Sequence, residues 1–244
     1  MRILEAVAFA RDPLGVTQIA KQLKLSKAGV FRYLQSLIEH GFVVQNRDTL
    51  RYRLGPKAYA VSHLAPVGSD LIDASDEPIR ELSRQTGLSV VLGAPMEDSV
   101  IIMRTFAGTR GMGLTVTPGR VIKPLHASVH GKLVLAFGPE ELKEKVLSAP
   151  LSPETPKTIT DPSQLRQELD KIRRVGFSMA LEENRLGVAA LAAPIFGPNN
   201  ELVGSIALVS FAHDITANPD PSLSEAAVDA AAKITKHLRS AAGL

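Results

Sequence analysis

The chain has 244 residues, a length that suggests two modest domains rather than a single small one. Its 45% apolar and 22% charged residues exclude wholesale disorder, and the absence of cysteine excludes disulfides, thiolate nucleophiles and cysteine-type zinc sites. No apolar run approaches the roughly 20 residues that span a bilayer, and residues 1–15 lack the pattern of a secretory signal. We therefore expect a cytoplasmic protein without a transmembrane helix.

Positive charge is concentrated at the start of the chain. Residues 1–62 carry ten Lys or Arg and four Asp or Glu, a net charge of +6, whereas the remaining 182 residues carry 18 bases and 21 acids, a net charge of −3. A basic head on a mildly acidic body is typical of a polyanion-binding module joined to a second domain. A solvated basic face would give the same count, so charge alone leaves both interpretations open.

Residues 1–55 show the pattern of short helices followed by a hairpin. Apolar residues at helical spacing predict helices over residues 3–8 and 17–23, and a third helix that Ser26 caps and Gly41 ends. Two strand-like runs, residues 42–45 and 50–54, then flank a polar turn. Together they predict a winged helix-turn-helix domain over residues 1–55.

The third predicted helix has an apolar stripe around Val30 and a polar face around Arg32. The polar face suits the DNA major groove, because Arg can grip guanine or phosphate and Gln can pair with adenine. The basic wing supports this interpretation over a solvated amphipathic helix, although Tyr52 and Arg53 could instead brace the wing against the core. The residues expected to contact DNA are Ser26, Lys27, Ala28, Gly29, Arg32, Gln35, Ser36, Arg47 and Arg51.

Beyond a connector over residues 56–68, broken by Pro66-Val67-Gly68, residues 69–244 alternate between helical and strand-like patterns. The predicted helices cover about residues 69–86, 128–137, 140–147, 163–175 and 222–242. The predicted strands cover residues 88–94, 99–106, 112–117, 177–182, 188–196 and 202–211. Strands grouped at both ends around helices predict an α+β domain with a mainly antiparallel sheet.

An ordered set of short motifs resembles the IclR family of bacterial transcriptional regulators over almost the whole chain. The motifs are Gly15-Val16-Thr17-Gln18-Ile19-Ala20, Ser26-Lys27-Ala28-Gly29-Val30-Phe31-Arg32-Tyr33-Leu34, Arg51-Tyr52-Arg53-Leu54-Gly55, Pro124-Leu125-His126-Ala127-Ser128 with Gly131-Lys132, Ile172-Arg173-Arg174-Val175-Gly176-Phe177, Glu182-Glu183, Gly187-Val188 and Ala192-Ala193-Pro194-Ile195. The resemblance implies a winged helix, a linker helix and a GAF-like effector-binding domain, which bind double-stranded operator DNA as a homodimer or homotetramer.

The chain departs from the family at two points. Gly29 stands where the family usually has Ser or Thr, which removes one phosphate contact and places a helix-weakening residue in the first turn. The chain also begins almost inside its first predicted helix, where relatives carry a leader, so Met1 is expected to be either a late start or the end of a trimmed chain.

The resemblance also implies where a small-molecule effector binds. Backbone N–H groups at Ser128, Val129 and His130 would favour a carboxylate at a helix N-terminus. The pocket wall carried over from the family consists of Leu88, Leu125, Val129, His130, Ala180, Ala190, Ala207 and Val209. Acid-sensing relatives have Asp, Cys or Ser at several of the last four positions, so their replacement by Ala and Val predicts an organic acid with an apolar body.

Other functions find less support in the sequence. His126 and His130 could hold a metal with Glu182 or Glu183, but the His-Glu-x-x-His signature is missing, so we expect no metal and no other cofactor. A vestigial enzyme around the same histidines would use Ser128 and His130, yet nucleophile-elbow and P-loop motifs are absent, and the glycines of 108–113 suit a surface turn. A sensor with a protein partner would not need the basic winged helix. We therefore expect a regulator and not an enzyme.

Overall fold

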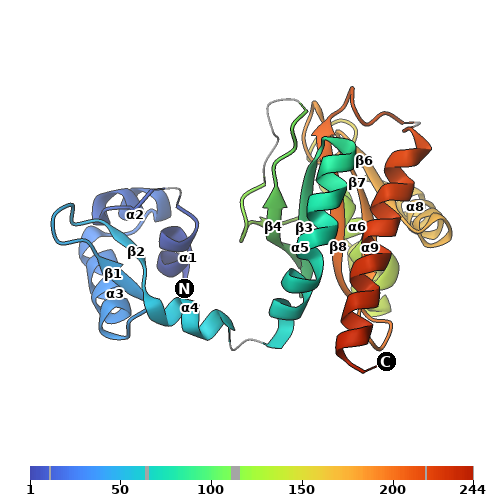
Figure 1. Ribbon diagram of the computed structural model, residues 1–244. Coiled ribbons are helices and arrows are strands. Elements are labelled where there is room, and N and C mark those ends of the chain that lie inside the picture. The colour runs from blue at the N-terminus through green and yellow to red at the C-terminus, as the bar shows by residue number, and fades with distance from the viewer. Residues whose placement is uncertain (11, 64–65, 111–115, 218, 244) are drawn as a thin grey trace. The chain divides into compact units, whose positions relative to one another are not determined.

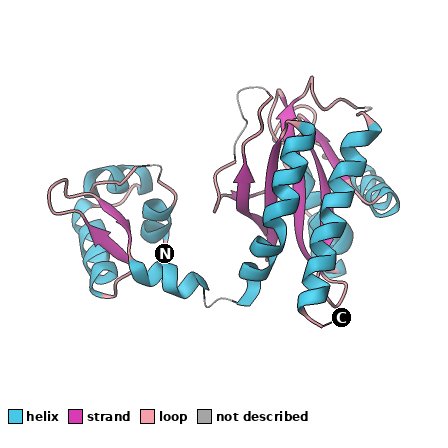
Figure 2. Ribbon diagram, in the orientation of Figure 1, coloured by secondary structure: helices cyan, strands magenta, loops and turns pink. Residues whose placement is uncertain are grey.

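The computed structural model describes residues 1–10, 12–63, 66–110, 116–217 and 219–243. Two compact units make up the chain, Met1–Ser69 and Asp70–Leu244. Figure 1 shows the course of the chain and Figure 2 its helices and strands.

The first unit is a winged helix-turn-helix. Its elements are α1 (Arg2–Ala8), α2 (Val16–Leu23), α3 (Lys27–Glu39), β1 (Val43–Gln45), β2 (Tyr52–Leu54) and α4 (Pro56–His63). Lys24 takes a left-handed conformation, φ 55°, at the tight turn between α2 and α3. Val30 and Leu34 of α3 are fully buried against Ile19 and Tyr52, so the apolar stripe predicted from the sequence forms the core of this unit.

The wing is shorter than predicted. β1 and β2 pair antiparallel from Val43 opposite Leu54 to Gln45 opposite Tyr52. Leu50, expected in the second strand, has φ 55° and is exposed, and its N–H bonds to the carbonyl of Asn46. The turn therefore takes up residues that the apolar run had assigned to the strand.

The second unit is an α+β domain around one antiparallel sheet. Six strands lie in the order β5-β4-β3-β8-β7-β6. The strands are β3 (Ser89–Met96), β4 (Ser99–Phe106), β5 (Val121–Ile122), β6 (Ser178–Leu181), β7 (Val188–Phe196) and β8 (Leu202–Phe211). The helices are α5 (Pro66–Thr86), a 3₁₀ turn (Leu125–Ala127), α6 (Val129–Phe137), α7 (Glu140–Leu147), α8 (Pro162–Val175) and α9 (Pro221–Ala241).

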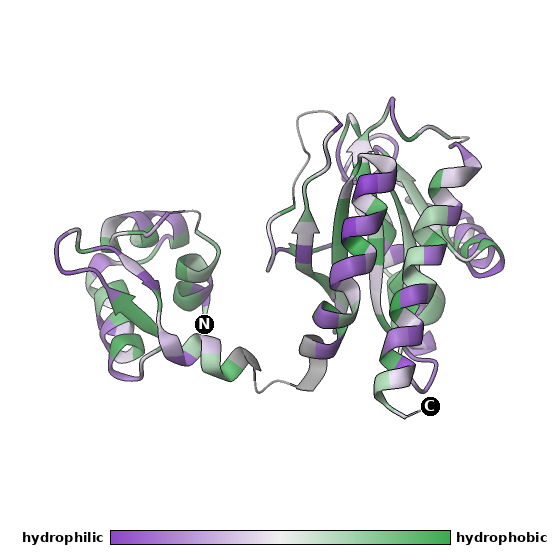
Figure 3. Ribbon diagram, viewed as in Figure 1, coloured by the Kyte–Doolittle hydropathy of each residue, from purple (hydrophilic) through white to green (hydrophobic). Residues whose placement is uncertain are grey.

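Helices cover both faces of this sheet, so its strands are apolar on both sides, as the green central strands of Figure 3 show. Residues of α5 and α9 pack on one face together with Val90 and Leu92 of β3. Residues of α6 and α8 pack on the other face together with Val91. Successive strand residues point to opposite faces, so a shift of one position moves a side chain from one core to the other.

Two elements differ from the prediction, and a third predicted element lies mostly outside the described residues. α5 begins at Pro66, three residues earlier than expected, because proline is tolerated in the first turn of a helix. Most of the strand predicted over residues 112–117 lies outside the described residues. The short strand β5 was not predicted, since two paired residues give too little alternation to recognise.

Candidate functional site

The polar face of α3 is exposed, as its periodicity predicted. Ser26 caps the helix, and its Oγ accepts a hydrogen bond from the N–H of Gly29 at 3.1 Å. The exposed residues of the predicted DNA-contact set on this helix and its cap are Ser26, Lys27, Ala28, Arg32 and Ser36, and the half-buried ones are Gly29 and Gln35. The arrangement gives α3 a charged, outward-facing surface of the kind that enters a major groove.

Two aromatic side chains flank this polar face and were not predicted as functional. Phe31 is 47% exposed and Tyr33 is 66% exposed. At 100° per residue they lie on either side of Arg32, which is the signal that would have identified them. Exposed aromatic side chains on a recognition helix can contact thymine methyl groups or a partner surface.

In the wing, the arginines that are exposed and those that brace the wing are not the ones expected from the sequence. Arg47 and Arg53 are exposed, whereas the Nη1 of Arg51 donates to the carbonyl of Pro13 at 3.2 Å. Tyr52 is buried, and its N–H bonds to the carbonyl of Leu14 at 2.8 Å. Tyr52 and Arg51 therefore brace the wing, and the bracing role suggested for Arg53 is wrong.

In the second unit, a cavity of about 110 Å³ lies between the sheet and the start of α6. Its wall contains six of the nine residues predicted to bind an effector: Ser128, Val129, His130, Ala180, Ala190 and Val209. Residues that were not predicted complete it: Val91, Ile102, Val116, Ile122, Asn184, Arg185, Val188 and Ala189.

The structure does not place the other three predicted residues in this wall. Leu88 packs against α5 and α9 on the opposite face of the sheet. Leu125 and Ala207 lie on the same face as the cavity but are buried in the packed core beside it. Their assignment was carried over by motif position, which does not specify the face of a strand or the depth of a side chain.

The start of α6 has unpaired backbone donors at residues that line this cavity. Ser128 caps the helix by accepting from the N–H of Gly131 at 3.0 Å. A Cβ on Gly131 would lie 2.1 Å from the carbonyl oxygen of Leu125, so only glycine fits under the preceding turn. The N–H groups of Val129 and His130 have no hydrogen-bond partner among the described residues, and both residues line the cavity.

His130 is a neutral side chain in the cavity wall. Its Nδ1 lies 2.7 Å from the Oγ of Ser205, and Gly93 leaves room for the ring, because a Cβ there would lie 2.9 Å from Nδ1. Burial lowers the pKa of His130 from 6.5 to about 4, so the imidazole carries no charge at neutral pH. When Nδ1 accepts from Ser205, Nε2 carries the proton and can donate to an acid.

The loop 182–187 closes the cavity on another side and brings the cation that the sequence analysis missed. Asn184 and Arg185 line the cavity from this loop, and both are exposed. The guanidinium of Arg185 forms no ion pair with any acid in the described part of the chain. No local sequence signal separates Arg185 from other loop arginines, because its place in the wall depends on the path of the loop.

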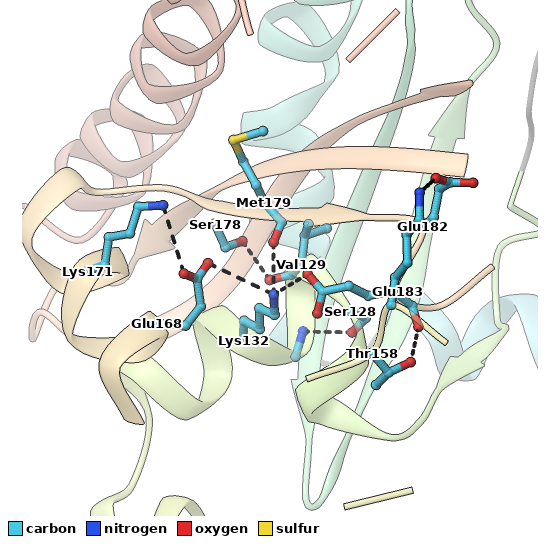
Figure 4. A network of polar contacts seen from close by, with 12 residues as sticks. Ser128, Val129, Lys132, Thr158, Glu168, Lys171, Ser178, Met179, Glu182 and Glu183 are labelled. Carbon is cyan, nitrogen blue, oxygen red and sulfur yellow. Dashed lines mark hydrogen bonds and ion pairs between the residues drawn. The ribbon is translucent and has the colours of Figure 1, made fainter. Parts of the chain in front are cut away.

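A buried ion pair attaches this loop to α6, as Figure 4 shows. Lys132 is fully buried, and its Nζ lies 2.6 Å from Oε1 of Glu183 and donates to the carbonyl of Met179 at 3.0 Å. Thr158 donates from its Oγ1 to the carbonyl of Glu183 at 2.6 Å. The pKa of Glu183 is raised by burial, which outweighs the opposing effect of Lys132. The ion pair thus holds the loop beside Asn184 and Arg185.

The two histidines considered as metal ligands have separate partners. The Nε2 of His126 lies 3.0 Å from the carbonyl of Ser152, away from the cavity wall. Glu182 pairs with Lys157, and Glu183 with Lys132. Across the described ranges, no three His, Asp or Glu side chains are placed to hold a metal ion.

Comparison with known proteins follows the division of the chain. Residues 1–47 match the family model of the IclR helix-turn-helix domain, and residues 64–236 match that of the bacterial transcriptional regulator IclR C-terminal domain. The chain belongs to the IclR family. No helix in the described part of the chain is long and apolar enough to cross a membrane.

Individual relatives agree with this assignment. The transcriptional regulator KdgR of Dickeya chrysanthemi is 31% identical over 195 residues, which cover 80% of this chain and 63% of that relative's length. The IclR structure of Thermotoga maritima is 28% identical, with a TM-score of 0.75 and coverage of 97% of this chain and 96% of that one. An IclR homologue from Microbacterium hydrocarbonoxydans, complexed with 4-hydroxybenzoate, has a TM-score of 0.84 at 21% identity, and the match covers 98% and 97% of the chains. The relatives bear names of regulators and not of enzymes, as the sequence motifs led us to expect.

Proposed function

We propose that the protein is a ligand-responsive transcriptional regulator that controls a catabolic operon in the cytoplasm. Residues 1–55 bind operator DNA, residues 56–68 form the linker, and residues 69–244 bind the effector. The protein works as a homodimer or homotetramer, because a two-fold assembly of winged helices matches two half-sites of an operator.

The DNA-binding part of the proposal is supported by the exposed polar face of α3 and the net charge of +6 over residues 1–62. Arg32 reads the major groove, and Ser26 and Lys27 contact phosphate at the helix N-terminus. Arg47 contacts the backbone from the wing, whereas Arg51 also holds the wing to Pro13. Binding of this kind weakens steeply as the salt concentration rises, because phosphate contacts release counterions.

The effector is a small organic acid, and the observation that carries this proposal is the donor set of the cavity. The unpaired N–H groups of Val129 and His130 bind the carboxylate, and Arg185 approaches it from the loop. The neutral His130 ring adds one donor without adding charge. The apolar part of the acid lies against Ala180, Ala190 and Val209, which offer no polar group.

The volume of the cavity limits the size of this acid. At about 110 Å³ it is smaller than an apolar cavity of about 150 Å³ that accommodates benzene in an engineered protein. A short branched aliphatic acid fits inside, and a single-ring aromatic acid fits with part of the ring at the opening. Isobutyrate, benzoate, 4-hydroxybenzoate and pyruvate therefore form the first set of test compounds.

A thermal-shift screen of these acids, followed by calorimetry and by footprinting upstream of the protein's own gene, tests the proposal. Ala190→Leu should fill the cavity and lower the affinity for the acid selected in the screen by at least about tenfold, or 1.4 kcal/mol. DNA binding in the absence of effector should stay unchanged. Arg185→Gln should weaken binding of the acid but should not weaken binding of the corresponding neutral amide. Arg174→Gln, a change of an exposed arginine outside the cavity wall, is the matched control.

Two results would contradict the effector assignment. Unchanged affinity in both Ala190→Leu and Arg185→Gln would place the acid elsewhere. If the amide binds as tightly as its acid, neither the helix N-terminus nor Arg185 recognises a carboxylate. An operator that is protected equally well by a chain carrying Arg32→Ala and Arg47→Ala would contradict the DNA-binding assignment.

A further inference from the structure

A second hollow, of about 650 Å³, lies at the C-terminal end of β7 and shares no lining residue with the effector cavity. β6 ends its pairing at Ser178 opposite Ala192, so the rest of β7 has a strand neighbour on β8 alone. The hollow is bordered by this open edge, by α9, which Figure 1 shows lying over the sheet, and by the ends of α6 and α8. Its volume is in the range of sites that bind small molecules, roughly 300–1,000 Å³.

Three cationic side chains line this hollow. Arg173 is engaged, since its Nε donates to the carbonyl of Ala136 and its Nη2 lies 3.6 Å from Glu140. Arg239 donates from Nη2 to Asn200 at 3.1 Å, but its Nε is buried without a hydrogen-bond partner. Lys236 is exposed and forms no ion pair among the residues that the structure describes. Among the described residues, no carboxylate therefore balances the two positive charges of Lys236 and Arg239.

The rest of the wall is apolar. Phe137 and Phe196 meet edge to face, with ring centroids 5.4 Å apart and planes at 86°. Ala193 of β7 and Val228 and Ala231 of α9 extend this surface. An apolar wall beside unbalanced cations suits a ligand that is apolar at one end and anionic at the other.

The open edge of β7 is unsuited to another strand. Pro194 has no N–H to donate, and the N–H of Phe196 is already bonded to Oγ1 of Thr235 at 3.1 Å. Strand addition needs such donors, so an extended peptide would lack its main-chain bonds here. A second copy related by a two-fold axis through the hollow would bring the same cations together. A small molecule suits the site better than either.

We propose that this hollow binds a phosphate monoester with an apolar, preferably aromatic, body. A monoester carries close to two negative charges at pH 7, which matches the positive charges of Lys236 and Arg239. The phosphate pairs with the guanidinium of Arg239 and accepts from Lys236. The apolar body lies against Phe137, Phe196 and Ala193. The protein therefore has a second ligand site, apart from the effector cavity.

Calorimetry on the full chain, with phenyl phosphate as the probe, tests this site. Phenyl phosphate should bind, and both phenol and inorganic phosphate should bind at least about tenfold more weakly, because each supplies half of the interaction. Lys236→Ala should weaken phenyl phosphate by about tenfold. The control is Lys233→Ala, which removes the same charge from the same helix outside the hollow together with the ion pair between Lys233 and Glu81. Ala190→Leu checks the effector cavity.

Four outcomes would overturn the proposal. If phenyl phosphate binds Lys236→Ala and the unchanged chain with equal affinity, Lys236 does not bind the ligand. If inorganic phosphate binds as tightly as phenyl phosphate, the apolar wall does not contribute to binding. Loss of binding in Ala190→Leu would place phenyl phosphate in the effector cavity. A change in the assembly state of Lys236→Ala, measured by sedimentation velocity, would show that a second copy of the chain occupies the hollow.

Discussion

The two units of the chain keep their proposed functional residues in opposite environments. In the first unit, Arg32 and Ser36 project from α3 into solvent, and the core beneath them is entirely apolar apart from Tyr52. In the second unit, His130, Lys132 and Glu183 are buried between the sheet and its helices. A side chain on an exposed face needs only a helix to hold it, whereas a buried polar group needs partners from distant parts of the chain.

This difference makes the two units respond differently to substitution. Surface residues can change binding without changing stability, and buried polar residues change both. All three tyrosines, Tyr33, Tyr52 and Tyr59, lie in the first unit, and the chain has no tryptophan. Tyrosine fluorescence therefore follows unfolding of the first unit alone, while circular dichroism follows both.

The largest effect is expected from Lys132→Met. The substitution leaves Glu183 buried without its cation, and breaking a buried pair in this way costs about 3–5 kcal/mol. Urea unfolding followed by circular dichroism should show the loss, and tyrosine fluorescence should not. Adding Glu183→Gln should restore part of it. The pair of exposed Lys157 with half-buried Glu182 supplies the control, since Lys157→Met should cost less than about 1 kcal/mol. Equal losses in the two variants would contradict a buried role for Lys132.

The next effect is a pH dependence that His130 gives to the second unit. Because its folded pKa is about 4 and its unfolded value 6.5, the unfolded chain binds a proton first as the pH falls. The free energy of unfolding should therefore be highest above pH 6.5 and should fall by about 3 kcal/mol as the pH is lowered from 6.5 to 4. His130→Gln should flatten this part of the profile of unfolding free energy, whereas the exposed His213→Gln should not. A profile that His130→Gln leaves unchanged would show that His130 titrates normally.

In the first unit, Arg32→Ala should weaken operator binding by about 1–3 kcal/mol at fixed salt, because the side chain faces away from the core. Its unfolding midpoint by tyrosine fluorescence should stay the same. Arg174→Ala removes an exposed arginine from the second unit and should leave the operator isotherm unchanged. A binding loss shared by both variants would reflect net charge and not reading by α3.

The smallest effect is expected from Ser26→Ala, which removes the hydrogen bond from the N–H of Gly29. Loss of such a cap costs about 1 kcal/mol, here in the stability of the first unit. Tyrosine fluorescence during urea unfolding measures it, with Ser36→Ala on the same helix as the control. If both variants unfold at the same urea concentration, the cap does not stabilise α3.

Sequence patterns were sufficient where structure depends on neighbours along the chain. The cap at Ser26, the stop at Gly41 and the outward face around Arg32 all follow from helical spacing and local hydrogen bonds. The order of the predicted strands and helices likewise predicted an α+β domain with a mainly antiparallel sheet. These features need no knowledge of which distant segments meet.

The proposed effector cavity could be recognised only from the tertiary structure. Strand periodicity says that Leu88 and Val91 point to opposite faces, but it does not say which helices cover each face, and so Leu88 was assigned to the wrong one. Arg185 entered the cavity wall because a loop is held to α6 by Lys132 and Glu183, which are 51 positions apart in sequence. Contacts across such distances follow from how the sheet and helices pack, and no local pattern encodes that packing.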